Sequence, residues 1–262
     1  MKNTLVWKRL LSQLSLKKTA YSRKVILLYH AVGHGSQALD LALFAQQMEW
    51  LDQHCDVLSL TQLLYAPPSD RIQVAISFDD GYACIYQHAA PILLSFNFPA
   101  IVYLNSGCIS QYASTRTKSD PNQGHYPDEF FLIWSEVLAL SQQGFEFGSH
   151  GVDHVNLTCI DVPARLEQLH VSKQTLELQL QKPCVHFAYT WGKHSPELRL
   201  AVAKMEYSYA VAAHHRPLEN TDHQYALPRM NIERDYSLQD FKNIVQGRWD
   251  YLGHIHRIKY WR

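Results

Sequence analysis

The residues best suited to chemistry form two short clusters, and each cluster follows an apolar run. Asp79 and Asp80 stand in Ser-Phe-Asp-Asp-Gly, where one carboxylate can bind a cation while its neighbour stays free as a base. His150 and His154 have His-x3-His spacing, which lets two imidazoles converge on one ion if the segment makes a helical turn. With Asp80, the two histidines offer two nitrogens and one carboxylate oxygen, a set typical of an open catalytic metal site.

Each cluster also has a plain structural interpretation. Asp-Gly is common in turns, so the carboxylate pair alone would fit a turn or a helix N-cap. The chain has 15 histidines, so a pair at this spacing arises easily by chance. His30 ends the first apolar run, where it would either protonate a leaving group or pack as a surface histidine. The clusters point to chemistry in combination rather than singly.

Composition and charge exclude several classes of protein. With 47% hydrophobic and 12% aromatic residues, the 262-residue chain can fill a large core, which excludes an intrinsically disordered protein. Lys and Arg number 24, as do Asp and Glu, so the basic excess of a nucleic-acid-binding protein is missing. The five cysteines form no Cys-x-x-Cys pair, and their scatter fits reduced thiols in a reducing compartment.

Residues 1–20 predict an amphipathic helix in front of a single catalytic domain over residues 21–262. Lys8 and Arg9 interrupt what would have to be an uncharged stretch, so a cleaved signal peptide is not expected. The helix would either pack on the domain or bind anionic lipid as a peripheral membrane contact. We therefore expect a cytoplasmic protein, with the inner membrane surface as the alternative location. The apolar residues of this helix are Leu5, Trp7, Leu10, Leu11 and Leu14.

Short apolar runs alternate with longer segments of helical spacing along the rest of the chain. This alternation predicts parallel βα units, and about seven such units in one domain suggest a barrel. In barrels of this kind the chemistry lies at the C-terminal ends of the strands, which is where the two clusters fall. The expected strands are 24–30, 57–60, 73–78, 99–104, 145–149, 185–189 and 207–213; the expected helices are 43–54, 84–96, one opened by Pro127 and Asp128, one capped by Asp161 and stopped near Pro183, 196–206 and 237–246.

Three segments resemble motifs of the polysaccharide deacetylases, the nodulation-type deacetylase domain of carbohydrate esterase family 4. Residues 77–82 (SFDDGY) resemble the family's T/S-F-D-D-G motif, and residues 149–154 (SHGVDH) resemble its H-S/T-x-x-H motif. Residues 187–192 (FAYTWG) resemble the third motif, a strand that usually ends in Y-P-Y-G or R-P-P-Y-G. The resemblance implies a deformed (β/α)7 barrel and a divalent metal, usually zinc, although cobalt or nickel would suit the same ligands.

The resemblance also implies a role for each charged residue of the motifs. Asp79 would be the general base, and Asp80, His150 and His154 would hold the metal. An Arg from a separate strand usually orients the base, and Arg229 is the candidate; otherwise it would be a surface Arg in an ion pair.

The family's catalytic acid is a His in an L-x-H motif near the C-terminus, in a context that this sequence lacks. Leu28-Tyr29-His30 matches the motif on the first expected strand instead. This order is similar to the permuted arrangement of the biofilm poly-N-acetylglucosamine deacetylases. The resemblance therefore implies that His30 is the acid.

Further residues are expected to contact the substrate. The backbone N–H of Tyr82 would stabilise the oxyanion, and Tyr189 and Trp191 would form a wall for a sugar ring unless they belong to the core. The third motif lacks its usual Pro, which alters the expected shape of the groove. Gly151 stands where many members carry a Ser or Thr that braces the metal-site loop. Residues 106–126 would either cover the groove and set specificity or form a surface loop.

We therefore expect a metal-dependent deacetylase that hydrolyses the N-acetyl group of an amino sugar and releases acetate. Its substrate would be an N-acetylated polysaccharide or a glycan precursor for exopolysaccharide, O-antigen or cell-wall biosynthesis. One alternative is a deacylase of a non-polymeric amide or an O-acetyl ester on the same scaffold. Another is a catalytically dead carbohydrate-binding relative, which would have no chemical need for the complete set of Asp79, Asp80, His150 and His154.

Overall fold

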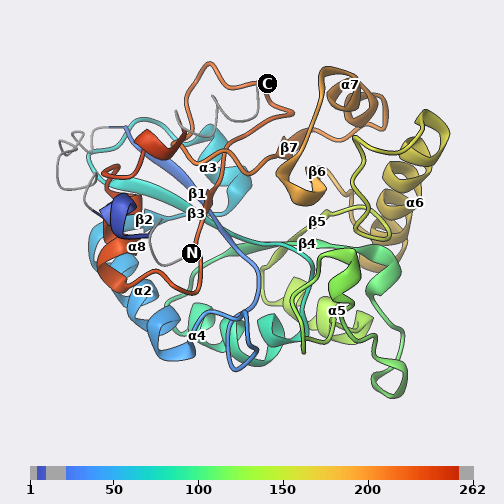
Figure 1. Ribbon diagram of the computed structural model, residues 1–262, viewed down its shortest axis with the longest axis horizontal. Helices are drawn as coiled ribbons and strands as arrows, with labels where there is room; N and C mark the ends of the chain where they lie inside the picture. The colour runs from blue at the N-terminus through green and yellow to red at the C-terminus, as the bar shows by residue number, and fades with distance from the viewer. Residues whose placement is uncertain (1–4, 10–21, 254–262) are drawn as a thin grey trace.

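One curled parallel β-sheet organises the molecule (Figure 1). The computed structural model describes residues 5–9 and 22–253. The strand order is β7-β6-β5-β4-β3-β1-β8, with β2 pairing separately with β3, and every one of these pairings is parallel. The strands are β1 (Lys24–Tyr29), β2 (Cys55–Val57), β3 (Ile72–Phe78), β4 (Ala100–Leu104), β5 (Glu146–Ser149), β6 (His186–Ala188), β7 (Tyr209–Val211) and β8 (Met230–Asn231).

The two ends of this sheet meet through a single bridge. Val211, at the end of β7, pairs with Leu227, which shortly precedes β8. Leu227 donates its N–H to Ala210, and Ala212 donates its N–H to Leu227, both at 2.9 Å or less. The contact is too short to count as a regular strand pair, so the barrel is incomplete on this side. The expected single α/β domain with a deformed (β/α)7 barrel is confirmed.

Helices cover the outside of the sheet, and most of those in the described residues begin at a residue whose side chain caps the first turn. Asp161 is the N-cap of the longest one and accepts a hydrogen bond from the N–H of Ala164 at 2.9 Å, as the sequence predicts. In Figure 1, α2, α4, α5 and α6 lie along the outer side of the strands. The helices are α2 (Leu41–His54), α3 (Leu60–Tyr65), α4 (Ala90–Ser95), α5 (Trp134–Gln142), α6 (Val162–Leu180), α7 (Pro196–Lys204) and α8 (Leu238–Val245).

The central strands are buried on both faces. All residues of β3 and β4 and all but the first of β1 are buried, because helices cover one side and the barrel interior lies on the other. This burial on both faces explains why these strands are apolar apart from Lys24, Gln73 and Ser77. This rigid centre places the residues that follow β1 and β3 at neighbouring positions on one edge.

Three expected elements differ from the structure. The helix expected from Asp128 begins only at Trp134, because Asp128 has a φ of 64° and Phe131 forms a bridge with Tyr82. The second strand ends at Val57 rather than at residue 60, since the next residues form the capping box of α3. The segment expected as one helix over 84–96 is a π-helical turn, Ile85–Ala89, that continues into α4.

The N-terminal segment is described only over residues 5–9, which are helical, so most of the expected helix over 1–20 lies outside the described residues. The described part packs on the domain: Tyr251 donates its hydroxyl to the carbonyl of Lys8 at 2.6 Å, and Arg9 pairs with Asp240. Within residues 5–9 and 22–253, no helix is both long and apolar enough to cross a bilayer. The five cysteines are all free thiols.

Candidate active site

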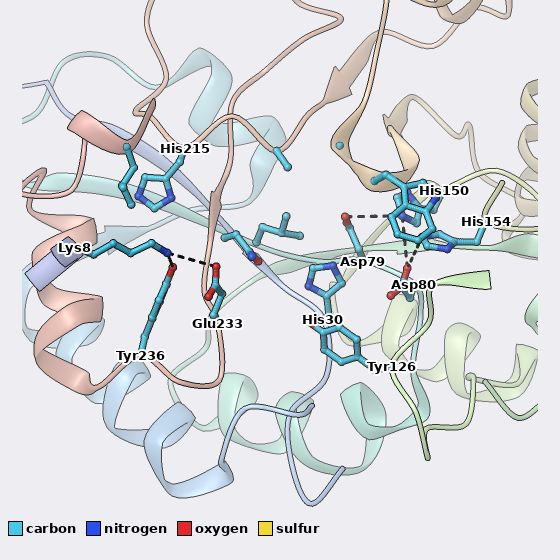
Figure 2. Close-up of a pocket in the computed structure, with 17 residues that line it drawn as sticks. Lys8, His30, Asp79, Asp80, Tyr126, His150, His154, His215, Glu233 and Tyr236 are labelled. Carbon is cyan, nitrogen blue, oxygen red and sulfur yellow. Dashed lines mark hydrogen bonds and ion pairs between the residues drawn. The ribbon is translucent and has the colours of Figure 1, made fainter. Parts of the chain in front are cut away.

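The predicted residues come together at one edge of the sheet because they follow neighbouring parallel strands. Asp79 and Asp80 follow β3, His150 follows β5, and His30 follows β1. They line a pocket of about 370 Å³ with His154 (Figure 2). The carboxyl ends of parallel strands carry the ligand sites in folds of this class.

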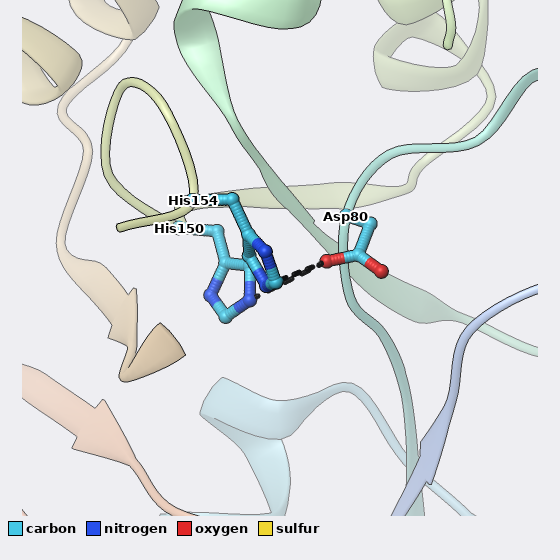
Figure 3. Close-up of side chains that lie close together, drawn as sticks. All are labelled: Asp80, His150 and His154. Carbon is cyan, nitrogen blue, oxygen red and sulfur yellow. Dashed lines mark ion pairs between the residues drawn. The ribbon is translucent and has the colours of Figure 1, made fainter. Parts of the chain in front are cut away.

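Asp80, His150 and His154 point their side chains at one spot (Figure 3). Oδ1 of Asp80 lies 3.6 Å from Nε2 of His150 and 3.4 Å from Nε2 of His154. All three side chains are buried, and one ligand atom from each lies within 4.8 Å of the others. The predicted ligand set is therefore assembled in the structure.

Backbone carbonyls orient both histidines. Nδ1 of His150 bonds to the carbonyl of Ala188, and Nδ1 of His154 bonds to that of Gln123, each at 2.8 Å. A carbonyl only accepts, so each Nδ1 carries a proton, and Nε2 of each ring faces Asp80. Burial lowers the pKa of His150 to about 4, and the Asp79 carboxylate opposes this effect only in part. The ring of His150 is therefore neutral at neutral pH.

These residues fit a divalent cation such as zinc. With Nδ1 holding the proton, Nε2 of each imidazole can offer a lone pair beside a carboxylate oxygen, an arrangement that favours a cation between them. Oδ1 of Asp80 is also buried without a hydrogen-bond partner among the described residues. Asp80 and His154 have φ values of 70° and 55°, a backbone strain that is typical of functional sites. Two His nitrogens and one carboxylate oxygen form a known open zinc site.

The loop between the two histidines is braced without a hydroxyl at Gly151. Gly151 has a φ of 82°, a conformation that favours glycine. Oε1 of Gln168, on α6, accepts the N–H groups of Val152 at 2.8 Å and Asp153 at 3.2 Å. A side-chain amide thus holds the loop from which the second histidine projects.

Asp79 is held by Arg229 in a buried two-bond ion pair. Nη1 lies 2.6 Å from Oδ1 and Nη2 lies 2.7 Å from Oδ2, and both residues are buried. Burial on its own would raise the pKa of Asp79, but Arg229 and His150 outweigh it and lower the pKa to about 2. Asp79 is therefore a carboxylate at neutral pH, as a base must be.

His30 lines the same pocket as the two carboxylates, beside Asp79 (Figure 2). Its ring stacks on Tyr126 with centroids 5.2 Å apart. Nδ1 is buried and has no hydrogen-bond partner among the residues that the structure describes. His30 thus has a ring nitrogen in the same pocket as Asp79, where a proton donor could act.

The three residues predicted to contact substrate lie in different surroundings. Tyr82 and Tyr189 are fully buried, and their side chains do not line the pocket: the Tyr82 hydroxyl accepts the N–H of Tyr126, and the Tyr189 hydroxyl donates to the carbonyl of Tyr225. Trp191 is 50% exposed and lines the pocket. Of the three, Trp191 is therefore the residue whose ring is exposed in the pocket.

The segment 106–126, before α5, contributes residues near the metal ligands, although the sequence predicts it only as a loop that covers the groove or lies on the surface. Tyr126 lines the pocket beneath His30, and His125 stacks on His154 with centroids 4.7 Å apart. Gly124 has a φ of 85°, and a Cβ there would lie 2.0 Å from the Trp191 ring, so glycine is needed for that close approach.

Sequence reasoning missed four polar residues at the other end of the pocket: Lys8, His215, Glu233 and Tyr236. Glu233 follows the strand that begins after Arg229, so the strand-end rule could have found it. Lys8 carries no such signal, because its segment reaches the pocket only through packing against the C-terminal part of the domain.

Comparisons with known proteins agree with this geometry. A sequence model of the family described as polysaccharide deacetylase matches residues 66–210, more than half of the chain. The protein YxkH of Bacillus subtilis (strain 168) is 25% identical over 229 residues, covering 85% of this chain and 76% of that protein. The poly-beta-1,6-N-acetyl-D-glucosamine N-deacetylase of Staphylococcus aureus (strain MRSA252) is 23% identical over 220 residues, covering 79% of this chain and 70% of its own length.

A solved structure shares the fold. The Streptococcus pyogenes deacetylase PplD, in complex with acetate, superposes with a TM-score of 0.73 at 20% identity, covering 85% of this chain and 98% of that one. The extent of the family match, with the predicted motif residues assembled in one pocket, shows that this chain belongs to the polysaccharide deacetylase family.

Proposed function

We propose that the protein is a metal-dependent deacetylase that hydrolyses the N-acetyl group of an amino sugar in a glycan and releases acetate. One observation carries the proposal: a carboxylate held ionised by an arginine, Asp79, lies beside a three-ligand cation site in one pocket. Amide hydrolysis needs a base for water, stabilisation of a developing oxyanion and an acid for the amine. The pocket offers a candidate for each.

Asp80, His150 and His154 would hold the metal ion. When bound, a divalent ion such as zinc polarises a carbonyl as a Lewis acid and lowers the pKa of water. The backbone carbonyls behind both imidazoles keep their Nε2 atoms turned toward the site, which strengthens binding without further rearrangement.

The remaining steps belong to groups of the chain. Asp79 accepts a proton from the attacking water, and Arg229 keeps both carboxylate oxygens in place for it. The backbone N–H of Tyr82 donates to the oxyanion. His30 gives a proton to the departing amine, leaving a free amino sugar and acetate. Trp191 offers its exposed face to the sugar ring.

The name of the Staphylococcus aureus relative supports an N-acetylglucosamine polymer as the first substrate to test. Metal-stripped protein is incubated with β-1,6-linked N-acetylglucosamine oligomers, with and without added zinc, and acetate is measured. We expect release only with zinc. Asp79→Asn should abolish it while zinc still binds, and Asp128→Asn, at an exposed carboxylate, should leave it unchanged.

Each other outcome is informative. Activity in Asp79→Asn would overturn the assigned base. Zinc binding without acetate release would move the search to precursor-linked sugars, O-acetyl esters or other amides. If no zinc binds, or if His154→Ala binds it as tightly as the parent, the proposed ligand set is wrong.

A further inference from the structure

The pocket continues beyond the proposed catalytic residues, toward a polar end that the N-terminal segment completes. Lys8, Glu233 and Tyr236 line this end, and in Figure 2 they lie across the pocket from Asp80 and His150. All three lie outside residues 66–210, the part matched by the family. The family match therefore assigns no function to these residues.

Lys8 places its ammonium group among acceptors and aromatic rings. Nζ donates to the hydroxyl of Tyr236 at 2.8 Å and lies 3.8 Å from Oε1 of Glu233. It also lies over the rings of Tyr236 and Trp249, 5.1 and 5.8 Å from their centroids. The side chains of Lys8 and Glu233 are 25% and 49% exposed, so neither side chain is fully covered by the protein.

Other contacts hold the segment in place independently of this ammonium group. The guanidinium of Arg9 bonds to both oxygens of Asp240 on α8, with Nη2 at 2.6 Å from Oδ2. The Tyr251 hydroxyl donates to the backbone carbonyl of Lys8. Because these bonds do not involve Nζ, removal of the Lys8 charge should not detach the segment.

The charges at this end favour a polyhydroxylated ligand over a free anion. Lys8 and Glu233 offset each other at 3.8 Å, and with the Tyr236 hydroxyl and the imidazole of His215 they present both donors and acceptors. Sugar hydroxyls and ring oxygens need this mixture. An isolated phosphate or carboxylate would meet Glu233 as a like charge.

We propose that Lys8 is a specificity residue that donates a hydrogen bond to an oxygen of a second sugar unit, next to the unit whose N-acetyl group is removed. The inference rests on the proposed function and deepens it. The substrate is then a glycan of at least two linked units. The N-terminal segment forms part of the wall of the pocket that binds it.

The test measures binding apart from turnover. Zinc-loaded full-length protein carrying Asp79→Asn is titrated with N-acetylglucosamine and its β-1,6-linked dimer, trimer and tetramer, with and without Lys8→Met. A charge-assisted hydrogen bond predicts roughly tenfold weaker binding of the oligomers in the double variant, with the monosaccharide unchanged. Lys8→Arg should restore most of the affinity. Lys204→Met, at an exposed lysine of α7 that does not line the pocket, is the matched control.

Kinetic measurements distinguish a role of Lys8 in substrate binding from a role in folding. In the protein that retains Asp79, and so its activity, Lys8→Met should raise KM for the oligomers and leave kcat near its original value. An equal loss for monosaccharide and oligomers, or no loss for either, overturns the inference while leaving the proposed function intact. If Lys8→Met loses more affinity for N-acetylglucosamine 1-phosphate than for the tetramer, Lys8 binds an anion and the inference is wrong. If the zinc-loaded protein neither binds the oligomers nor releases acetate from them, these oligomers are not its substrate, and the search moves to the precursors, esters and other amides named above.

Discussion

Arg229 binds both oxygens of Asp79 and at the same time helps to close the barrel. Its Nη1 and Nη2 lie 2.6 and 2.7 Å from the carboxylate that follows β3, and its Nε donates to the carbonyl of Ala212, just beyond β7, at 3.2 Å. Arg229 itself directly precedes β8. One buried guanidinium therefore joins three strands, and the orientation of the proposed base is coupled to closure of the sheet.

Arg229→Met should cost both stability and turnover. It leaves the Asp79 carboxylate buried without its cation, which destabilises proteins by about 3–5 kcal/mol, and the pKa of Asp79 should rise. Arg229→Lys keeps a charge but cannot form two parallel bonds, so we expect folded protein with much reduced turnover. Urea unfolding and acetate release at neutral pH measure the two effects. Full activity in Arg229→Lys would show that the two-bond geometry does not matter.

His30→Gln should slow amide hydrolysis without loss of metal. Removing a general acid lowers the rate by roughly 10²–10⁴-fold. An activated acetyl ester has a leaving group that departs without a proton, so its hydrolysis should fall far less. Rates for both substrates are compared with zinc content. An equal fall for the amide and the ester would contradict the role of proton donor.

Trp191→Ala should weaken substrate binding more than folding. The ring is half exposed beside His154, so a sugar that covers it buries additional apolar surface. We expect KM to rise roughly tenfold, because such burial contributes about 1–2 kcal/mol. Trp191→Phe should retain part of the effect. Trp7→Ala, at an exposed ring outside the pocket, serves as the control; if the two Ala variants behave alike, the stacking role fails.

The ion pair between Arg9 and Asp240 should make stability depend on pH. Burial would raise the pKa of Asp240, but hydrogen bonds from Arg9 and Ser237 outweigh it and lower the pKa from the usual 3.8. A lowered pKa gives stability that is complete above pH 3.8 and is lost as the pH falls through the folded-state value. The difference in unfolding free energy between the parent and Asp240→Asn should therefore be constant near neutral pH and shrink below about pH 4.

Urea unfolding at several pH values measures this difference. Asp235→Asn, at an exposed carboxylate nearby, should show little dependence of this kind. A difference that stays constant down to pH 3 would contradict the assignment. Limited proteolysis of the N-terminal segment gives a second measure, since Asp240→Asn should expose residues 5–9 to cleavage at neutral pH.

Much of the candidate site could be predicted because its residues directly follow strands. Asp79, Asp80 and His30 come immediately after apolar runs, and parallel strands bring such positions to one edge of the sheet. The alternation of strands and helices predicts the fold for the same local reason. Boundaries were less predictable where a turn competed with a helix, as at Asp128.

The sequence by itself therefore determined the type of fold, the motif residues and the edge at which they meet, because these follow from local periodicity and chain direction. Only the tertiary structure decided which aromatic ring faces the pocket: Tyr189 turns inward to bond with Tyr225, while Trp191 remains half exposed. It also decided that Lys8 reaches the pocket. Such contacts depend on packing between segments far apart in the chain, and local sequence patterns do not predict that packing.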